Sequence, residues 1–165
     1  MTKLRPVADA DLPGVAAIYA HYVETGVATF DETPPPVEEW RAKRAAIAGA
    51  GLPFLVVEDE GEVAGFAYAG PYRPKPAYRH TVEDTVYLAP GATGRGLGRL
   101  LLGEVIDRAG RAGARQMVAV VADGGDPASL RLHAAFGFEQ AGRLRSVGLK
   151  HDRWIDTVLL QRALR

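Results

Sequence analysis

The sequence has no cysteine, no excess of charge of either sign and no long apolar run. Without cysteine the chain has no disulfide, no thiolate metal site and no cysteine nucleophile. Twenty Lys and Arg residues balance twenty Asp and Glu residues, so the net charge favours neither a nucleic acid nor an anionic membrane as partner. No apolar stretch approaches the roughly 20 residues that span a bilayer, and the start, MTKLRPVADADLPG, does not resemble a secretory signal. We therefore expect a soluble, cytoplasmic protein that binds neither nucleic acid nor membrane.

The residues that are present have the balance of an ordinary globular protein. Apolar residues make up 47% and charged residues 24% of the 165 positions, as in folded soluble proteins. A chain of this length buries a core that is stable without disulfides. We find no internal repeat and no low-complexity linker, so we expect one domain over residues 1–165.

Hydrophobic periodicity and turn residues predict seven strands and four helices. The strands are expected at 4–7, 54–58, 63–69, 81–88, 117–122, 142–147 and 154–160. The helices are expected from an N-cap at Asp9 to Gly26, at 37–50, at 97–112, and from a cap at Asp126 to Gly137. This order predicts a mixed sheet with an antiparallel hairpin early in the chain and a parallel strand, helix, strand crossover through 97–121. The apolar run 117–122 predicts a central strand that is buried on both faces.

A glycine-rich turn, TGRGLG at 93–98, joins the strand at 81–88 to the following helix. Backbone N–H groups converge at such a turn, and the positive end of the helix dipole adds to their attraction for phosphate oxygens. The turn is not a Walker loop, because Arg99 and Leu100 stand where Lys and then Ser or Thr are required. It also lacks the early parallel strand of a dinucleotide-binding domain. From these residues alone, a flexible surface turn remains an equal alternative.

The stretch VYLAPGATGRGLGRLLL resembles the signature of the GNAT superfamily of acetyl-CoA-dependent N-acetyltransferases. In that signature a strand ends at a proline turn, and Gln or Arg, two residues, Gly, one residue and Gly or Ala then open a helix. Gly96 and Gly98 match the two motif glycines, whereas Thr93 stands where Gln or Arg is usual. Because backbone amides do most of the phosphate holding, we expect Thr93 to modify the loop without abolishing binding.

The resemblance spans essentially the whole chain. RHTVEDTVYLAP, DPASLRLHAAFGF and VGLKHDRWIDTVLLQ are similar to segments of the phosphinothricin and methionine sulfone or sulfoximine N-acetyltransferases. It implies the α/β GNAT fold, a mixed, mostly antiparallel seven-stranded sheet flanked by four helices, in which the strands ending at Leu88 and near Ala122 splay apart around the acetyl-pantetheine arm. It also implies acetyl-CoA as co-substrate, no metal, and a homodimer. The cofactor contacts that it implies are Val86, Tyr87, Leu88, Thr93, Gly94, Arg95, Gly96, Leu97, Gly98, Arg99 and Asp126.

Acetyl transfer from a thioester to an amine needs a neutral nitrogen, a polarised carbonyl and a proton for the leaving thiolate. The resemblance assigns Glu83 as the base, the Leu88 N–H as the donor to the thioester oxygen, and His133 as the acid. On its own, Glu83 is equally a solvated carboxylate, and His133 is by default a packing residue. Asp126 is fully explained as a helix cap, which leaves its cofactor contact open.

The proline-rich segment after residue 70 predicts a long functional loop. We expect the substrate contacts in this loop, with an apolar wall from an earlier one; the residues are Arg73, Tyr78, Arg79 and His80, with Phe30 as the wall. Each is alternatively a solvated side chain. An aromatic residue in a terminal strand is typically buried, so we expect Trp154 in the core, although with Lys150, Arg153 and Asp156 it also suits a pocket rim or a subunit contact.

Three functions remain open. The first is an N-acetyltransferase acting on a small amino-acid analogue such as phosphinothricin, methionine sulfone or methionine sulfoximine. The second is a GNAT enzyme for another amine, such as a peptide N-terminus, a polyamine or an aminoglycoside; the basic residues of the expected substrate loop argue for an anionic substrate instead. The third is an acyl-CoA sensor without turnover.

Overall fold

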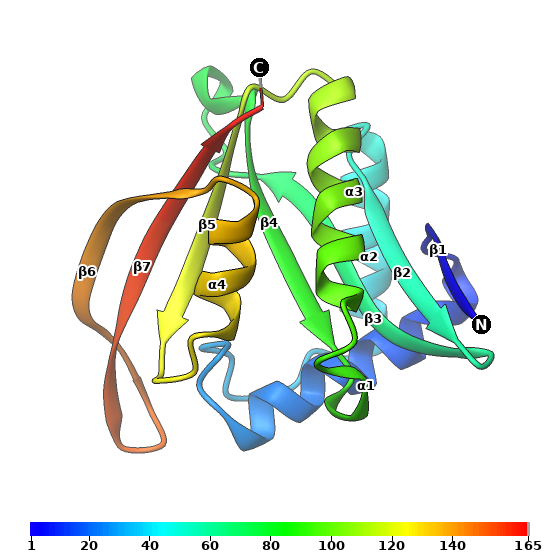
Figure 1. The fold of residues 1–165 in the computed structure, drawn as a ribbon, viewed down its shortest axis with the longest axis horizontal. Helices are drawn as coiled ribbons and strands as arrows, with labels where there is room; N and C mark the ends of the chain where they lie inside the picture. The colour runs from blue at the N-terminus through cyan, green and yellow to red at the C-terminus, as the bar shows by residue number, and fades with distance from the viewer. Residues whose placement is uncertain (165) are drawn as a thin grey trace.

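The computed structural model describes residues 1–164, and its seven strands form a single sheet in the order β1-β2-β3-β4-β5-β7-β6 (Figure 1). The strands are β1 Thr2–Pro6, β2 Phe54–Asp59, β3 Glu62–Pro71, β4 Thr81–Leu88, β5 Gln116–Asp123, β6 Glu139–Lys150 and β7 Arg153–Ala163. The helices are α1 Leu12–Thr25, α2 Val37–Gly49, α3 Leu97–Arg111 and α4 Ala128–Ala135. Short 3₁₀ turns occupy η1 Asp9–Asp11, η2 Pro76–Tyr78 and η3 Pro90–Ala92. The predicted elements and the mixed, mostly antiparallel sheet are confirmed, because within the described chain only β4 and β5 pair in parallel.

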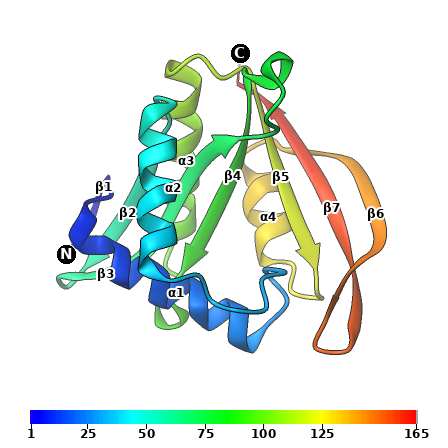
Figure 2. The same ribbon diagram turned by 180° about the vertical axis from the view of Figure 1, so that it is seen from behind.

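Two helices pack on each face of the sheet, over different strands. Figure 1 shows α3 and α4 on one face, and Figure 2 shows α1 and α2 on the other, over β2, β3 and β4. One apolar cluster lies between α3 and the sheet and includes Leu101, Val105 and Met117. A second cluster, rich in aromatic rings, lies under α1 and α2 and includes Trp40 and Phe66. No helix within residues 1–164 is long and apolar enough to cross a membrane.

Strand β4 has side chains on both faces of the sheet, and these side chains have different surroundings on each face. Its even-numbered side chains, such as Val82 and Asp84, are buried on the α3 and α4 side, and Glu83 and Tyr87 face α1 and α2. This follows from the alternation of side chains along a strand, as the sequence predicts. Pairing with β5 ends at Glu83, beyond which the two strands diverge toward their carboxyl ends (Figure 1).

Two expectations for the β5, β7 and β6 side of the sheet are wrong. Strand β5 is not buried on both faces, because the Val120 side chain is 42% exposed. Trp154 does not enter the core, because it is 67% exposed. Val120 is exposed because no helix covers this part of the sheet on the α1 and α2 side (Figure 2). Trp154 alternates onto the opposite face, with Val158 and Leu160, at the start of β7. Helix coverage depends on tertiary packing that an apolar run does not encode.

The first helix begins differently from the prediction. Asp9 is not its N-cap; it opens the turn η1 and forms an ion pair of 2.8 Å with Arg41 of α2. Asp11 is the residue before α1, but its side chain makes no cap bond to this helix; its carboxylate instead accepts a hydrogen bond of 2.7 Å from the Ala8 N–H across η1 and pairs with Arg5 at 2.7 Å. The buried carboxylate is therefore the one with both an amide and a guanidinium to satisfy it.

Candidate active site

The glycine turn presents the N-terminus of α3 without a side-chain cap. Gly94 and Gly96 have φ values of 75° and 80°, in the left-handed region that favours glycine. Gly96 is the N-cap residue, and no acidic residue occurs in the first turn. The Leu100 N–H bonds the Gly96 carbonyl, so the three preceding amides have no partner within the helix. Open N–H groups at the positive end of a 15-residue helix fit a phosphate.

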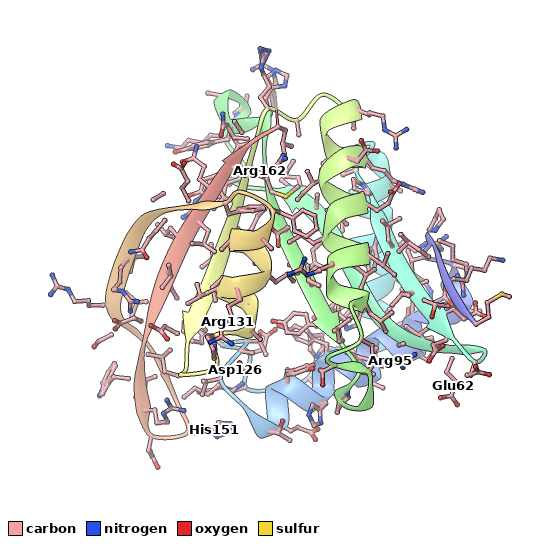
Figure 3. The ribbon with its side chains drawn as sticks, in the orientation of Figure 1. Glu62, Arg95, Asp126, Arg131, His151 and Arg162 are labelled. Carbon is pink, nitrogen blue, oxygen red and sulfur yellow. The ribbon has the colours of Figure 1, made fainter. Side chains whose placement is uncertain are left out.

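The two arginines beside the turn have different surroundings. Arg95 donates a hydrogen bond of 2.7 Å to Asp59 at the end of β2, and this bond lowers the pKa of the Asp59 carboxyl below its ordinary value. Figure 3 shows Arg95 on the β2–β3 side of the start of α3. Arg99 and Thr93 are exposed. Gly98 is buried instead, and a Cβ there would lie 3.5 Å from Leu132, so this glycine serves the contact between α3 and α4.

The end of β4 exposes backbone groups on the side where β5 has diverged. The Ala89 N–H bonds the Ala64 carbonyl at 2.8 Å, and the Tyr72 N–H bonds the Thr81 carbonyl at 3.2 Å. In an antiparallel ladder, these bonds mean that the backbone N–H and C=O groups of the odd-numbered β4 residues point toward β3. The N–H and C=O groups of Val86 and Leu88 consequently point away from β3, past the last parallel pair at Glu83. This orientation leaves the Leu88 N–H suited to the oxyanion role that the sequence assigns to it.

Tyr87 lies on the other side of this strand. Its ring packs against Tyr19 with centroids 5.2 Å apart, and its hydroxyl donates to the Ala28 carbonyl at 3.3 Å. Leu97 is buried in the cluster beneath α3. For these two predicted cofactor contacts, the side chains therefore pack in the interior, and only backbone groups of Leu97 reach the turn.

Glu83 faces a cavity of about 320 Å³ between α2 and the sheet. The lining residues are Lys43, Ala46, Ile47, Tyr68, Gly70, Pro71, Glu83 and Thr85. Burial and the charge of Asp84 raise the pKa of the Glu83 carboxyl above its ordinary value, while Arg73 and Lys43 oppose the shift. A partly desolvated carboxylate with a raised pKa, open to a cavity, is suited to accept a proton near neutral pH.

Glu83 is the one lining residue that the sequence predicted as a site residue; of the others, Lys43 and Tyr68 bring a charge and an aromatic ring to the cavity. Lys43 of α2 places its ammonium 5.1 Å from the centroid of the Tyr68 ring, on β3. The charge of Lys43 also reaches Glu83. Lys43 follows an ordinary polar pattern in α2, and no local signal separates it from Lys and Arg residues that face solvent. Only the packing of α2 over β3 and β4 brings it to the site.

His133 lies behind β4, on the face opposite Glu83. Its Nε2 is 2.8 Å from Asp84 Oδ1, and its Nδ1 is 2.7 Å from the Ser129 carbonyl. The His133 side chain is 4% exposed. Burial alone would lower the pKa of His133, but the hydrogen bond and charge of Asp84 outweigh it and raise this pKa. The general-acid role of His133 remains a prediction, and in this geometry both ring nitrogens already have partners.

Asp126 lies one residue before the cap that the sequence predicts it to be, because Pro127 is the N-cap residue and α4 begins at Ala128. Its carboxylate accepts a hydrogen bond of 3.0 Å from the Ala128 N–H, at the first residue of the helix. Figure 3 shows Asp126 at the same end of the sheet as Arg95, on the other side of the end of β4. A cofactor contact by Asp126 stays a prediction.

The loop before β4 places none of the predicted substrate residues among those that line the cavity, and only the charge of Arg73 reaches Glu83. Arg73 lies 5.0 Å from the centroid of the Tyr72 ring, and its charge lowers the pKa of Glu83. Tyr78 contacts the same Tyr72 ring from the other end of the loop, with centroids 5.6 Å apart. Arg79 instead donates to the Pro76 carbonyl at 3.1 Å.

His80 is exposed, and its carbonyl accepts a hydrogen bond of 2.8 Å from the Arg115 N–H at the start of β5. Its backbone thus anchors the loop to the next strand. The arrangement favours Arg73 as the predicted substrate residue with the most direct influence on Glu83.

Phe30 lies in a loop that is held by residues of α1 and β6. The Tyr19 hydroxyl of α1 lies 2.5 Å from Thr29 Oγ1 and also donates to Asp31. Lys150 of β6 is 3% exposed and donates a hydrogen bond of 2.8 Å to the Thr29 carbonyl. The Phe30 ring covers Gly148, where a Cβ would lie 2.4 Å from the ring. The loop that carries the predicted apolar wall is therefore fixed on both sides.

Comparison with known proteins agrees with this geometry. The profile of the "Acetyltransferase (GNAT) family" matches residues 15–138. The chain is 56% identical, over 98% of its length and 82% of the relative, to "Phosphinothricin N-acetyltransferase" of Alcaligenes faecalis. It is 41% identical, over 96% of its length and 92% of the relative, to "L-methionine sulfoximine/L-methionine sulfone acetyltransferase" of Pseudomonas paraeruginosa.

A solved structure extends the likeness to three dimensions. The GNAT superfamily phosphinothricin acetyltransferase of Sinorhizobium meliloti, crystallised in complex with AcCoA, matches with a TM-score of 0.93 and 45% identity, over 98% of this chain and 88% of that one. The sheet order, the glycine turn and the matched sequence lead to the same conclusion. The chain belongs to the GNAT family of acetyltransferases.

Proposed function

We propose that this protein transfers the acetyl group of acetyl-CoA to the amino group of a small amino-acid analogue that bears an anionic group, such as phosphinothricin, methionine sulfone or methionine sulfoximine. The observation that carries the proposal is the Glu83 carboxyl, whose pKa is raised in a cavity that also receives the charges of Lys43 and Arg73. The relatives named above act on substrates of this type. The open N-terminus of α3 supplies the amides for the pyrophosphate of acetyl-CoA.

The reaction follows from the positions of these groups. An amino acid enters with its amine protonated, and Glu83 accepts one ammonium proton, directly or through water, to give the neutral nucleophile. The amine nitrogen then forms a bond with the thioester carbonyl carbon, and the Leu88 N–H stabilises the negative charge that develops on the carbonyl oxygen. When the intermediate collapses, the C–S bond breaks, the second proton leaves nitrogen, and the thiolate takes up a proton to become the CoA thiol.

The charges around the cavity favour an acceptor with an anionic group. Lys43 and Arg73 approach Glu83 from α2 and from the loop before β4. Two cations near one general base repel a polyamine and attract a carboxylate, a phosphinate or a polarised sulfone oxygen. The cavity of about 320 Å³ suits a small molecule better than a folded protein surface.

An amine panel read by thiol release tests the proposal. The panel contains phosphinothricin, methionine sulfone and methionine sulfoximine, with spermidine, a short peptide and an aminoglycoside as comparison amines. We expect release with the first group and a loss of about 10²- to 10⁴-fold in kcat for Glu83→Gln. Thiol release that is fastest with spermidine or the peptide would overturn the substrate class. Bound CoA without any thiol release would favour a sensor.

We also infer that residues 1–165 act as one domain, that the protein works in the cytoplasm, and that two copies associate. The homodimer is supported by two exposed apolar side chains that pair across β6 and β7, Leu149 and Trp154. Clustered apolar exposure of this kind marks association surfaces. Light scattering after size exclusion tests it, and Trp154→Lys should shift a dimer toward monomer.

A further inference from the structure

The hydroxyl of Tyr22 stands at the point where β4 ends beside the diverging β5. It donates a hydrogen bond of 2.5 Å to the Leu88 carbonyl, 66 positions away in the chain. This carbonyl belongs to the set of β4 backbone groups that point away from β3. Helix α1 therefore contributes one polar group to the edge of β4 that the acetyl group is expected to use.

The ring of Tyr22 is held in place by its neighbours. It packs against Tyr87 with centroids 5.2 Å apart, and against His21 at 5.1 Å with the planes nearly perpendicular. The side chain is partly buried, so one part of it remains open to a bound molecule. With the ring fixed, the remaining freedom of the group is rotation of the O–H about its C–O bond.

A second influence on the hydroxyl comes from a charged residue in the turn after β5. The pKa of Tyr22 is raised by burial and by the negative charge of Asp126, which lies between β5 and α4. The hydroxyl is thus hydrogen-bonded to the end of β4 and influenced by the charge of Asp126 in the turn after β5. It also remains protonated at neutral pH, and so keeps a hydrogen to donate.

The other candidate proton donors are engaged elsewhere. Both ring nitrogens of His133 have partners on the far side of β4. The Tyr19 hydroxyl is bound to Thr29 and Asp31, and the Tyr87 hydroxyl to the Ala28 carbonyl. Among the hydroxyl and imidazole groups around the end of β4 that are described here, Tyr22 is the one bonded to the strand edge itself.

We propose that Tyr22 is the general acid of the reaction and protonates the departing CoA thiolate. This inference rests on the proposed function. As the C–S bond breaks, its electron pair moves to sulfur, and the Tyr22 O–H turns from the Leu88 carbonyl to give its proton to that sulfur. The tyrosinate regains a proton from solvent, which has received the second proton of the amine nitrogen. The sum is one amide, one free thiol and the proton that Glu83 first removed.

A titration of bound CoA tests this assignment without turnover. The ultraviolet absorbance of the thiolate reports the pKa of the CoA thiol in complex with wild-type protein and with Tyr22→Phe. A hydrogen bond to an ionised group stabilises that group, so removing the hydroxyl should raise the thiol pKa by about one unit or more. In the steady state, kcat should fall about 100-fold while KM for acetyl-CoA and for the amine changes little. An identical thiol pKa in the two proteins would overturn the proposal.

Tyr19→Phe is the matched control, because Tyr19 lies one helical turn earlier and its hydroxyl contacts Thr29 and Asp31 instead of β4. It should leave the thiol pKa unchanged. If Tyr22→Phe does not fold, the wild-type complex alone decides: its bound thiol must titrate below free CoA, and an equal or higher pKa contradicts the assignment. The proposed function fails separately, by absence of CoA binding or of thiol release across the amine panel.

Discussion

His133 Nε2 lies 2.8 Å from Asp84 Oδ1, and this pair is buried directly behind the strand position that bears Glu83. The pair joins α4 to β4, because the partners are 49 positions apart in the chain. Asp84 Oδ2 has no hydrogen-bond partner in the described structure, so the bond from His133 to Oδ1 is the main interaction that stabilises the buried Asp84 carboxylate. Neighbouring residues of β4 therefore have different surroundings: Glu83, the proposed base, faces the cavity, and Asp84 bonds a residue of α4.

His133→Ala should destabilise the fold by about 3 kcal/mol, because it leaves a buried carboxylate without its partner. The pKa of His133 is raised in the folded state, so the stability from its protonation is present below its unfolded pKa of about 6.5 and is lost as pH rises through the folded value. Urea unfolding at pH 6 and pH 9 should show a larger difference between wild type and variant at pH 6. Ser129→Ala is the control, since the His133 Nδ1 contacts the Ser129 carbonyl, which this change retains. A difference below 1 kcal/mol at both pH values would contradict the structural role.

Lys43→Met should move the acid limb of the kcat/KM profile to higher pH. The Lys43 charge opposes the rise in the pKa of Glu83, so removing it allows burial and Asp84 to raise that pKa further. Since the base must be ionised to act, activity at pH 6 should fall more than activity at pH 9. Lys75→Met serves as control, because Lys75 belongs to the exposed loop and does not line the cavity. An acid limb at the same pH in Lys43→Met and Lys75→Met would show that Lys43 does not influence the pKa of Glu83.

The sequence was informative where a local pattern determines the outcome. The alternation of TVEDTVYL correctly assigned Glu83 and Asp84 to opposite faces of β4, and the glycine turn correctly marked the start of α3. It did not reveal that Asp84 pairs with His133, or that Lys43 reaches the cavity, because both contacts depend on how helices pack on the sheet. It also did not predict the exposure of Trp154.

Asp59 restrains Arg95 next to the glycine turn, where we propose that the pyrophosphate binds. The Asp59 carboxylate is 17% exposed and bonds Arg95 at 2.7 Å. Asp59→Asn removes a negative charge beside the turn and should lower KM for acetyl-CoA about threefold, in keeping with the modest strength of partly exposed ion pairs. Arg95→Met should raise this KM about tenfold. Steady-state kinetics at low and high salt measure both effects, which should shrink at high salt through screening. Equal KM values for wild type and both variants would exclude Arg95 from cofactor binding.

Lys150 connects the end of β6 to the loop that carries Phe30. Its buried ammonium donates to the Thr29 carbonyl, and burial lowers its pKa below the ordinary value. Lys150→Met keeps the length and apolar stem of the side chain but removes the donor, leaving the Thr29 carbonyl unsatisfied. The loop should then hold Phe30 less firmly over Gly148, so KM for the amine should rise about fivefold, equivalent to about 1 kcal/mol of a lost hydrogen bond, with kcat and KM for acetyl-CoA nearly unchanged.

Arg153→Met is the comparison for Lys150→Met, because Arg153 lies three positions on and donates at 3.1 Å to the Gly124 carbonyl instead of to this loop. It should leave KM for the amine unaltered. If Lys150→Met lowers kcat instead of raising KM for the amine, Lys150 acts on the chemical step and the loop is not its target. A change in KM for the amine alone, with kcat and KM for acetyl-CoA unchanged, would identify the loop around Phe30 as part of the substrate site.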